Sequence, residues 1–197
     1  MDFLILLILA TSAFIATNLD DIFLLAAFFS NNTFSTTNIV LGQYLGLSIL
    51  ILISIIASFI HLIVPSSVIS LLGFLPVIIG IKNLWEIKKD KSNIGTLAQS
   101  PQKNSSSIMQ VSLVTMANGG DNLGVYIPLL ANLNPSDITV VVLTFLVLTG
   151  AWCLLSYKIV NNRFIERKIR TYGHIILPFV LIGIGIFIIL RGGGLSL

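Results

Sequence analysis

The sequence is dominated by apolar stretches that are too long for the core of a small soluble domain. A membrane-spanning helix needs ~20 mainly apolar residues. Stretches of about that length lie at residues 3–29, 38–62, 68–86, 107–131, 138–158 and 171–190. Only 10% of the residues are charged, against roughly 25% in a soluble domain. We therefore predict an all-α membrane protein with six transmembrane helices in a lipid bilayer.

The first apolar stretch has the length of a secretory signal peptide but not its charge. Asp2 stands where a signal peptide carries Lys or Arg, and the apolar run continues past Asp21. We expect this stretch to be the first membrane helix of the mature protein.

The basic residues predict the orientation in the membrane. Ten of the eleven Lys and Arg residues fall within residues 82–103 and 158–170. With six spans these two segments lie on the same face, and loops rich in Lys and Arg face the cytoplasm. A five-span arrangement would place them on opposite faces or discard an apolar stretch. We therefore expect a multi-pass protein of the cell membrane with both termini outside.

A short motif occurs twice. Thr17–Asp21 and Ala117–Asp121 align at an offset of 100 residues. Each half holds three predicted spans, so the second half must be inverted relative to the first, a plan that recurs in transporters. We predict two inverted three-helix repeats, at residues 1–87 and 107–197, joined by a cytoplasmic linker at 88–106.

Three carboxylates lie well inside the apolar stretches, namely Asp20, Asp21 and Asp121. A carboxylate at bilayer depth costs at least ~2.5–3.5 kcal/mol, and no Lys or Arg lies at a comparable depth to neutralise it. One interpretation is structural, with the carboxylates held by helix–helix hydrogen bonds. We favour a bound cation or protons, and we expect the three to meet in one pocket near the bilayer midplane.

The neighbours of these carboxylates suit a hard or borderline divalent cation, which prefers carboxylate and amide oxygens. On a continuous helix Thr17, Asp20 and Asp21 would share one face at spacings of three and four residues. The predicted metal ligands are Asp20, Asp21, Asp121, Asn118, Asn122 and Asn18. Thr17, Gln43 and Tyr126 are candidates for the surrounding shell, or for ordinary interhelical hydrogen bonds.

Two glycine pairs have their own interpretations. Gly119-Gly120 either weakens the fourth helix just before Asp121 or offers a small surface for helix packing. Gly42-x-x-x-Gly46 indicates close packing of the second helix, although that signal is common. His61 and His174 lie near helix ends, where anchoring at the interface is a simpler role than metal binding.

Motifs for other chemistries are missing from the sequence. It contains no phosphate-binding GxxxxGK[ST] loop, no HExxH and no nucleophile elbow. The single cysteine, Cys153, excludes an intrachain disulfide and a thiolate metal cluster, and we expect it to be buried in a span. We therefore expect no enzyme activity, no prosthetic group and no nucleic-acid partner; a homo-oligomer is left open.

At the two motifs the sequence is similar to a known family. ATNLDDIFLLAAFF (16–29), NGGDNLGVYIPLL (118–130) and YGHIILP (172–178) resemble the CadD-type cadmium-resistance transporters of bacteria, in the lysine-exporter superfamily. The likeness extends over the whole chain. It implies efflux of Cd²⁺, with Zn²⁺ as a second candidate, across the bacterial inner membrane. It also implies a role for the residues that match the motifs, which are Asn18, Asp20, Asp21, Asn118, Asp121 and Asn122.

Export of a divalent ion against an inside-negative potential needs a driving force, about 4.6 kcal/mol per 100 mV for two charges. Protons that replace the ion on the same carboxylates would supply it, which predicts metal/proton antiport. The alternatives are an exporter of Mn²⁺, Ca²⁺ or an amino acid, and a metal-dependent enzyme embedded in the membrane. An amino-acid carrier would want a cationic residue in the membrane, and an enzyme would need a substrate cleft with a general base.

Overall fold

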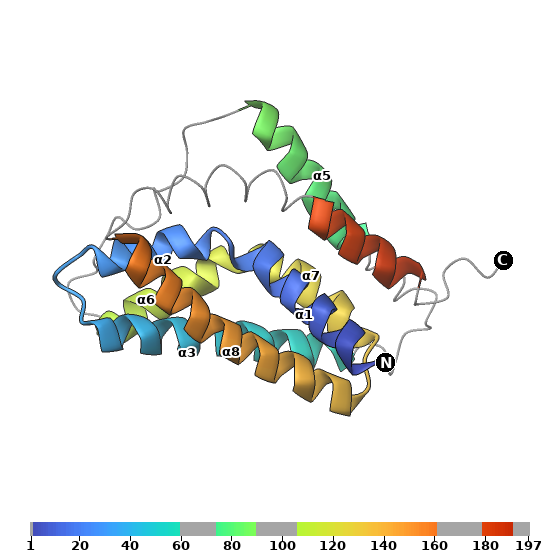
Figure 1. The fold of residues 1–197 in the computed structure, drawn as a ribbon, viewed down its shortest axis with the longest axis horizontal. Helices are drawn as coiled ribbons and strands as arrows, with labels where there is room; N and C mark the ends of the chain where they lie inside the picture. The colour runs from blue at the N-terminus through green and yellow to red at the C-terminus, as the bar shows by residue number, and fades with distance from the viewer. Residues whose placement is uncertain (1, 60–73, 90–105, 161–178, 191–197) are drawn as a thin grey trace.

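The computed structural model describes residues 2–59, 74–89, 106–160 and 179–190. These residues form α-helices joined by short connections, and this part of the chain contains no β-strand. The helices are α1 (Phe3–Asn18), α2 (Asp21–Phe29), α3 (Thr36–Ser58), α5 (Phe74–Lys89), α6 (Ser107–Asn118), α7 (Gly120–Ala131), α8 (Pro135–Val160) and an unlabelled helix at Phe179–Leu190 (Figure 1). The all-α prediction is confirmed for these residues.

Two helices, α3 with 23 residues and α8 with 26, are long and apolar enough to cross a membrane alone. The pair α1 and α2 passes the same test together, with a bend of 59° between them, and Phe179–Leu190 is a shorter apolar helix. The described residues thus hold two candidate spans, or three with the bent pair. The six-span inverted repeat stays a prediction, since the stretches 68–86 and 171–190 extend outside the described residues. His61, His174 and most of the linker also lie outside the described residues.

The first and fourth predicted spans are broken, and the breaks fall at matching places. α1 ends at Asn18 and α2 begins at Asp21; α6 ends at Asn118 and α7 begins at Gly120. The continuous helix expected over residues 3–29 is wrong, and so is the single helical face inferred for Thr17, Asp20 and Asp21. The break before Asp121 agrees with the weakening expected from Gly119-Gly120. Helices α1 and α2 run opposite to α6 and α7, as inverted repeats require (Figure 1).

Serine side chains fix where two helices begin. The Ser35 hydroxyl accepts a hydrogen bond from the Asn38 backbone N–H at 3.2 Å and caps α3. The Ser106 hydroxyl accepts from the Met109 N–H at 3.4 Å and caps α6. Such caps satisfy N–H groups that have no partner within the helix. The first turns of α3 and α6 lie at the same end of the bundle as the end of α8 (Figure 1).

Close approach of α3 and α6 depends on the two glycines of the Gly42-x-x-x-Gly46 motif. A Cβ atom at Gly42 would lie 2.6 Å from the Val111 Cβ, and one at Gly46 would lie 2.8 Å from the Thr115 Cβ. Neither distance is tolerated between real side chains, so only glycine fits at these positions. The close packing predicted from the motif is confirmed.

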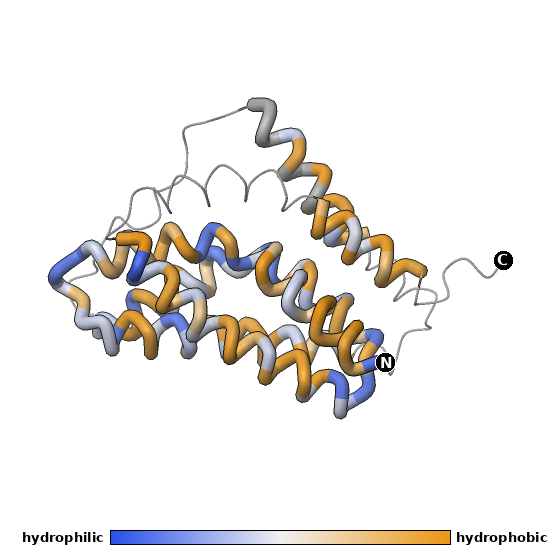
Figure 2. The backbone as a smooth tube through the Cα atoms, in the orientation of Figure 1, coloured by the Kyte–Doolittle hydropathy of each residue, from blue (hydrophilic) through white to orange (hydrophobic). Residues whose placement is uncertain are grey.

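The buried apolar residues form two clusters. The larger cluster joins α1, α3, α7, α8 and Phe179–Leu190, and includes Phe14, Tyr126 and Phe145. The smaller one joins α2, α3, α6 and α8. It contains Cys153, which is 3% exposed as expected for a residue inside a span. Many large apolar side chains are also exposed on the outside of the helices, and hydrophilic residues interrupt the apolar sequence where α1 meets α2 (Figure 2).

Candidate metal centre

The two helix breaks meet inside the bundle. Asn18 is the last residue of α1 and Asp21 the first of α2, while Asn118 is the last residue of α6 and Asp121 the second of α7. A break exposes the free C=O groups of one helix and the free N–H groups of the next. One of these N–H groups, that of Asp21, donates a hydrogen bond to Asp20 Oδ1 at 3.2 Å.

Asn118 joins the second half of the chain to the carboxylates of the first. Its side-chain Nδ2 donates to Asp20 Oδ2 at 2.9 Å and to Asp21 Oδ1 at 2.8 Å. Asp21 is only 3% exposed, whereas Asp20 is half-buried. Residues almost a hundred positions apart are therefore brought into direct contact, and the contact is made by residues that the sequence motif singled out.

The second oxygen of Asp21 is held from α3. Gln43 Nε2 donates to Asp21 Oδ2 at 3.0 Å, and Gln43 is 3% exposed. Both side-chain partners of Asp21 in the described part are thus neutral amides. Since a neutral amide does not cancel the charge of a carboxylate, the arrangement leaves Asp21 suited to a cation.

A second polar group lies between α1 and α7 and contains no carboxylate. Asn18 Nδ2 donates to the Tyr126 hydroxyl at 2.7 Å and to Thr17 Oγ1 at 2.9 Å. Asn122 Nδ2 donates to Asn18 Oδ1 at 3.2 Å. All four residues are buried. The Asn122 Oδ1 atom has no hydrogen-bond partner among the described residues, which is unusual for a buried acceptor.

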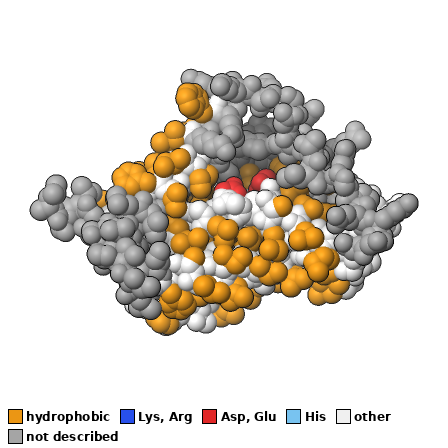
Figure 3. Space-filling view, turned by 180° about the vertical axis from the view of Figure 1, so that it is seen from behind, with side chains coloured by type: hydrophobic (Ala, Val, Ile, Leu, Met, Phe, Trp, Pro, Cys, Tyr) orange, Lys and Arg blue, Asp and Glu red, His pale blue; other side chains and the backbone are white. Residues whose placement is uncertain are grey.

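Asp121 is half-buried and lies next to Asn122 at the start of α7. In the described residues, no three His, Cys, Asp or Glu side chains lie close enough to hold one metal ion. The expected pocket of three carboxylates is therefore not formed by Asp20, Asp21 and Asp121 alone. An ion there would need amide oxygens as well, and Asn118 would have to turn its Oδ1 toward the ion. Acidic side chains are visible on one face, next to polar or backbone atoms and with apolar side chains nearby (Figure 3).

Two contacts at the site were not found from the sequence. The Trp152 indole N–H donates to the Asn18 backbone oxygen at 2.6 Å and so caps the carbonyl end of α1. The Thr115 hydroxyl donates to Gln43 Oε1 at 2.6 Å. Thr115 precedes Asn118 by three residues, so helical spacing could have indicated it. Nothing in the sequence indicates the contact made by Trp152, which lies on α8, 134 residues from Asn18.

The chain is similar to a known protein family over the whole of this site. A family model described as cadmium resistance transporter matches residues 14–197, a range that includes both breaks and every predicted ligand. No curated protein and no solved structure matches the chain.

Proposed function

The chain belongs to the cadmium resistance transporter family, and we propose that it exports divalent heavy-metal cations, Cd²⁺ first and Zn²⁺ second, in exchange for protons. The observation that carries the proposal is the contact of Asn118 with both Asp20 and Asp21 across the two breaks. It gathers carboxylate and amide groups from both halves at one place within helices that are otherwise apolar.

The chemistry of the site favours a divalent cation over a permanent structural role. A carboxylate inside the membrane needs a charge to balance it, and the side-chain partners of Asp21 are neutral. The unpartnered Asn122 Oδ1 adds a buried oxygen at the neighbouring break. Carboxylate and amide oxygens suit a borderline divalent ion, and the family supplies the preference for cadmium. The ligand set we propose is Asp20, Asp21, Asp121, Asn118, Asn122 and Asn18.

Protons are the coupling ion in this proposal. The sequence has no ATP-binding motif, yet export of two charges against an inside-negative potential costs about 4.6 kcal/mol per 100 mV. Two protons entering for each metal ion leaving would make the exchange electrically neutral and remove this cost. Metal and protons would then use the same carboxylates in turn, so metal binding should weaken as the pH falls.

The test is transport by the full-length protein in sealed liposomes. Cd²⁺ movement is followed with an enclosed fluorescent indicator while the pH difference and the membrane voltage are set independently. We expect Cd²⁺ to move against its gradient when protons move the opposite way, and to stop when the pH difference is dissipated. Zn²⁺ should compete with Cd²⁺.

The outcomes separate the two parts of the proposal. Liposomes that carry the folded protein but no Cd²⁺ flux would overturn metal export. Cd²⁺ flux that ignores the pH difference would retain metal transport and rule out proton exchange. Proton-coupled export of Mn²⁺ or Ca²⁺ with none of Cd²⁺ would favour the alternative substrates.

A further inference from the structure

The Gln43 side chain is held at both ends between three helices. From α3 its Nε2 reaches Asp21 Oδ2 on α2 at 3.0 Å, and its Oε1 accepts from the Thr115 hydroxyl on α6 at 2.6 Å. Gln43 is 3% exposed and Thr115 4% exposed. Water therefore does not compete with either contact.

The direction of these hydrogen bonds follows from the groups involved. A carboxylate only accepts, so Gln43 must turn its N–H toward Asp21 and its oxygen toward Thr115. The Thr115 hydroxyl has one proton and two acceptors within reach, Gln43 Oε1 at 2.6 Å and the Val111 carbonyl at 3.1 Å. The shorter contact is to Gln43. The hydroxyl thus holds the amide in the orientation that Asp21 requires.

The glycines of α3 place these groups at this distance. A Cβ atom at Gly46 would lie 2.8 Å from the Thr115 Cβ, and one at Gly42 would lie 2.8 Å from the Ile108 carbonyl oxygen. Gln43 follows Gly42 directly and therefore lies where α3 and α6 pack closely. Close helix packing here brings a hydroxyl of α6 to an amide of α3.

We propose that Thr115 is a positioning residue for metal binding: through Gln43 it orients the Asp21 carboxylate so that Asp21 Oδ1 faces Asn118 and the ion. The inference rests on the proposed function, because it takes Asp21 as a ligand of the transported cation. Thr115 itself touches neither the ion nor Asp21. A partner such as Gln43, which bonds a ligand from outside the metal site, typically changes metal affinity 10- to 100-fold when removed, and Thr115 acts through it, so its effect should lie at the lower end of that range.

The experiment compares a variant that removes the Thr115 hydroxyl with one that keeps it. Thr115→Val keeps the shape and removes the O–H, whereas Thr115→Ser keeps the O–H. Thr149→Val is the matched control, since Thr149 is fully buried and its hydroxyl donates to its own helix, at Phe145 O. Binding of radioactive Cd²⁺ to the detergent-solubilised full-length protein and Cd²⁺ transport in liposomes are measured for each.

We expect Thr115→Val to weaken Cd²⁺ binding about tenfold and to raise the transport KM with little change in the maximal rate. Thr115→Ser and Thr149→Val should bind like the wild type. Equal binding by Thr115→Val and the wild type would overturn the inference, and so would equal losses in Thr115→Val and Thr115→Ser. If Thr115→Val does not fold, Thr115→Ala and Thr115→Ser form a second pair that differs only in the hydroxyl. A wild type that binds no Cd²⁺ would instead overturn the proposed function.

Discussion

The two helix breaks differ in what creates them. The break between α1 and α2 holds two carboxylates and no glycine, and its groups are held by Asn118 and Trp152 from other helices. The break between α6 and α7 falls at Gly119-Gly120, residues with low helix propensity. The first break thus combines a local cap by Asp20 with contacts from distant helices, while the second is favoured mainly by its own glycines. Two of the three carboxylates, Asp20 and Asp21, lie at the first break, where side chains of other helices bind them.

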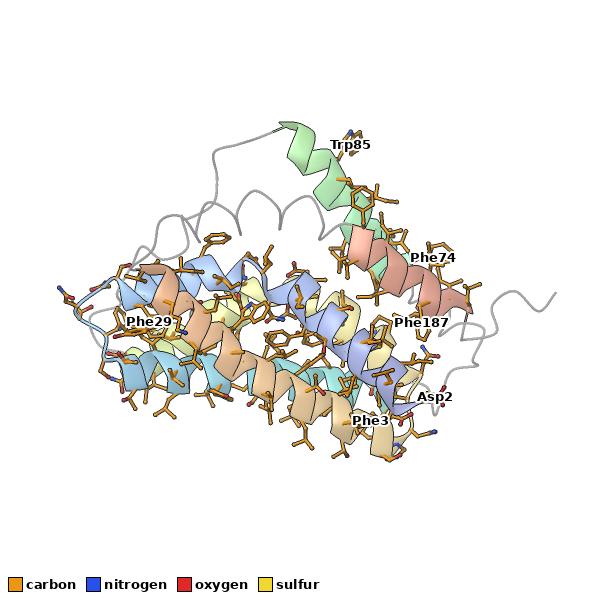
Figure 4. The ribbon with its side chains drawn as sticks, viewed as in Figure 1. Asp2, Phe3, Phe29, Phe74, Trp85 and Phe187 are labelled. Atoms are coloured by element: carbon orange, nitrogen blue, oxygen red, sulfur yellow. The ribbon has the colours of Figure 1, made fainter. Side chains whose placement is uncertain are left out.

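The largest effect should follow from removing the charge at the first break. Asp21→Asn keeps the shape of the side chain and removes its negative charge, so we expect Cd²⁺ export to fall by more than about 100-fold, beyond the usual loss from an outer partner. Asp2→Asn is the matched control, because Asp2 is exposed at the start of α1 and its side chain makes no capping bond (Figure 4). Cadmium tolerance of cells and liposome transport are the measurements. Full export by Asp21→Asn at normal expression would contradict the assignment of Asp21.

Replacing the equivalent asparagine of each break by alanine should impair the protein in different ways. Asn118→Ala removes the group that joins Asp20 and Asp21, so we expect about 10- to 100-fold weaker Cd²⁺ binding with little loss of stability. Asn18→Ala leaves buried partners without hydrogen bonds, among them Asn122 Nδ2, and should destabilise the protein by about 1–3 kcal/mol. Thermal unfolding in detergent and Cd²⁺ binding distinguish the two. Because Asn18 is also a proposed ligand, its loss should weaken Cd²⁺ binding as well. A destabilised Asn118→Ala together with a fully stable Asn18→Ala would contradict these roles.

The adjacent glycines of the second break offer a matched pair. A Cβ atom at Gly119 would overlap the buried Leu50 side chain, whereas one at Gly120 would meet nothing within 4 Å. We expect Gly119→Ala to destabilise the protein by about 1–3 kcal/mol, because a well-packed site tolerates extra volume poorly. Gly120→Ala should be neutral or slightly stabilising. Equal melting temperatures for the two variants would show that packing against Leu50 does not matter.

The smallest effect concerns the cap of the first break. Trp152→Phe keeps an aromatic ring against Phe14 but removes the indole N–H that donates to the Asn18 oxygen. We expect a loss of about 0.5–1.5 kcal/mol in the free energy of unfolding. Trp85→Phe is the control, since Trp85 is 71% exposed and projects from α5, away from the bundle (Figure 4). Equal stability of the two variants would mean that the hydrogen bond from Trp152 to the Asn18 oxygen does not stabilise the first break.

Several features were predictable from the sequence because they depend on local properties. Apolar length indicated membrane helices, and two of them, α3 and α8, have full spanning length. The rarity of carboxylates inside such helices identified Asp20 and Asp21, which the fold brings to one amide of the other half. Glycine spacing predicted the contact of α3 with α6, because the absence of a side chain has the same consequence in any helix.

Only the tertiary structure decided the break at Asn18–Asp21 and the partners of the carboxylates. Asn18, Asp20 and Asp21 are weak helix formers and Asp20 caps α2, but this local preference alone does not require α1 to end at Asn18. The stabilising contacts come from Asn118, 97 residues from Asp21, and from Trp152, 134 residues from Asn18. Hydrogen bonds at such separations depend on how whole helices pack. The sequence by itself determined which residues are too polar for the membrane; the packing of α3, α6 and α8 determined what each of them touches.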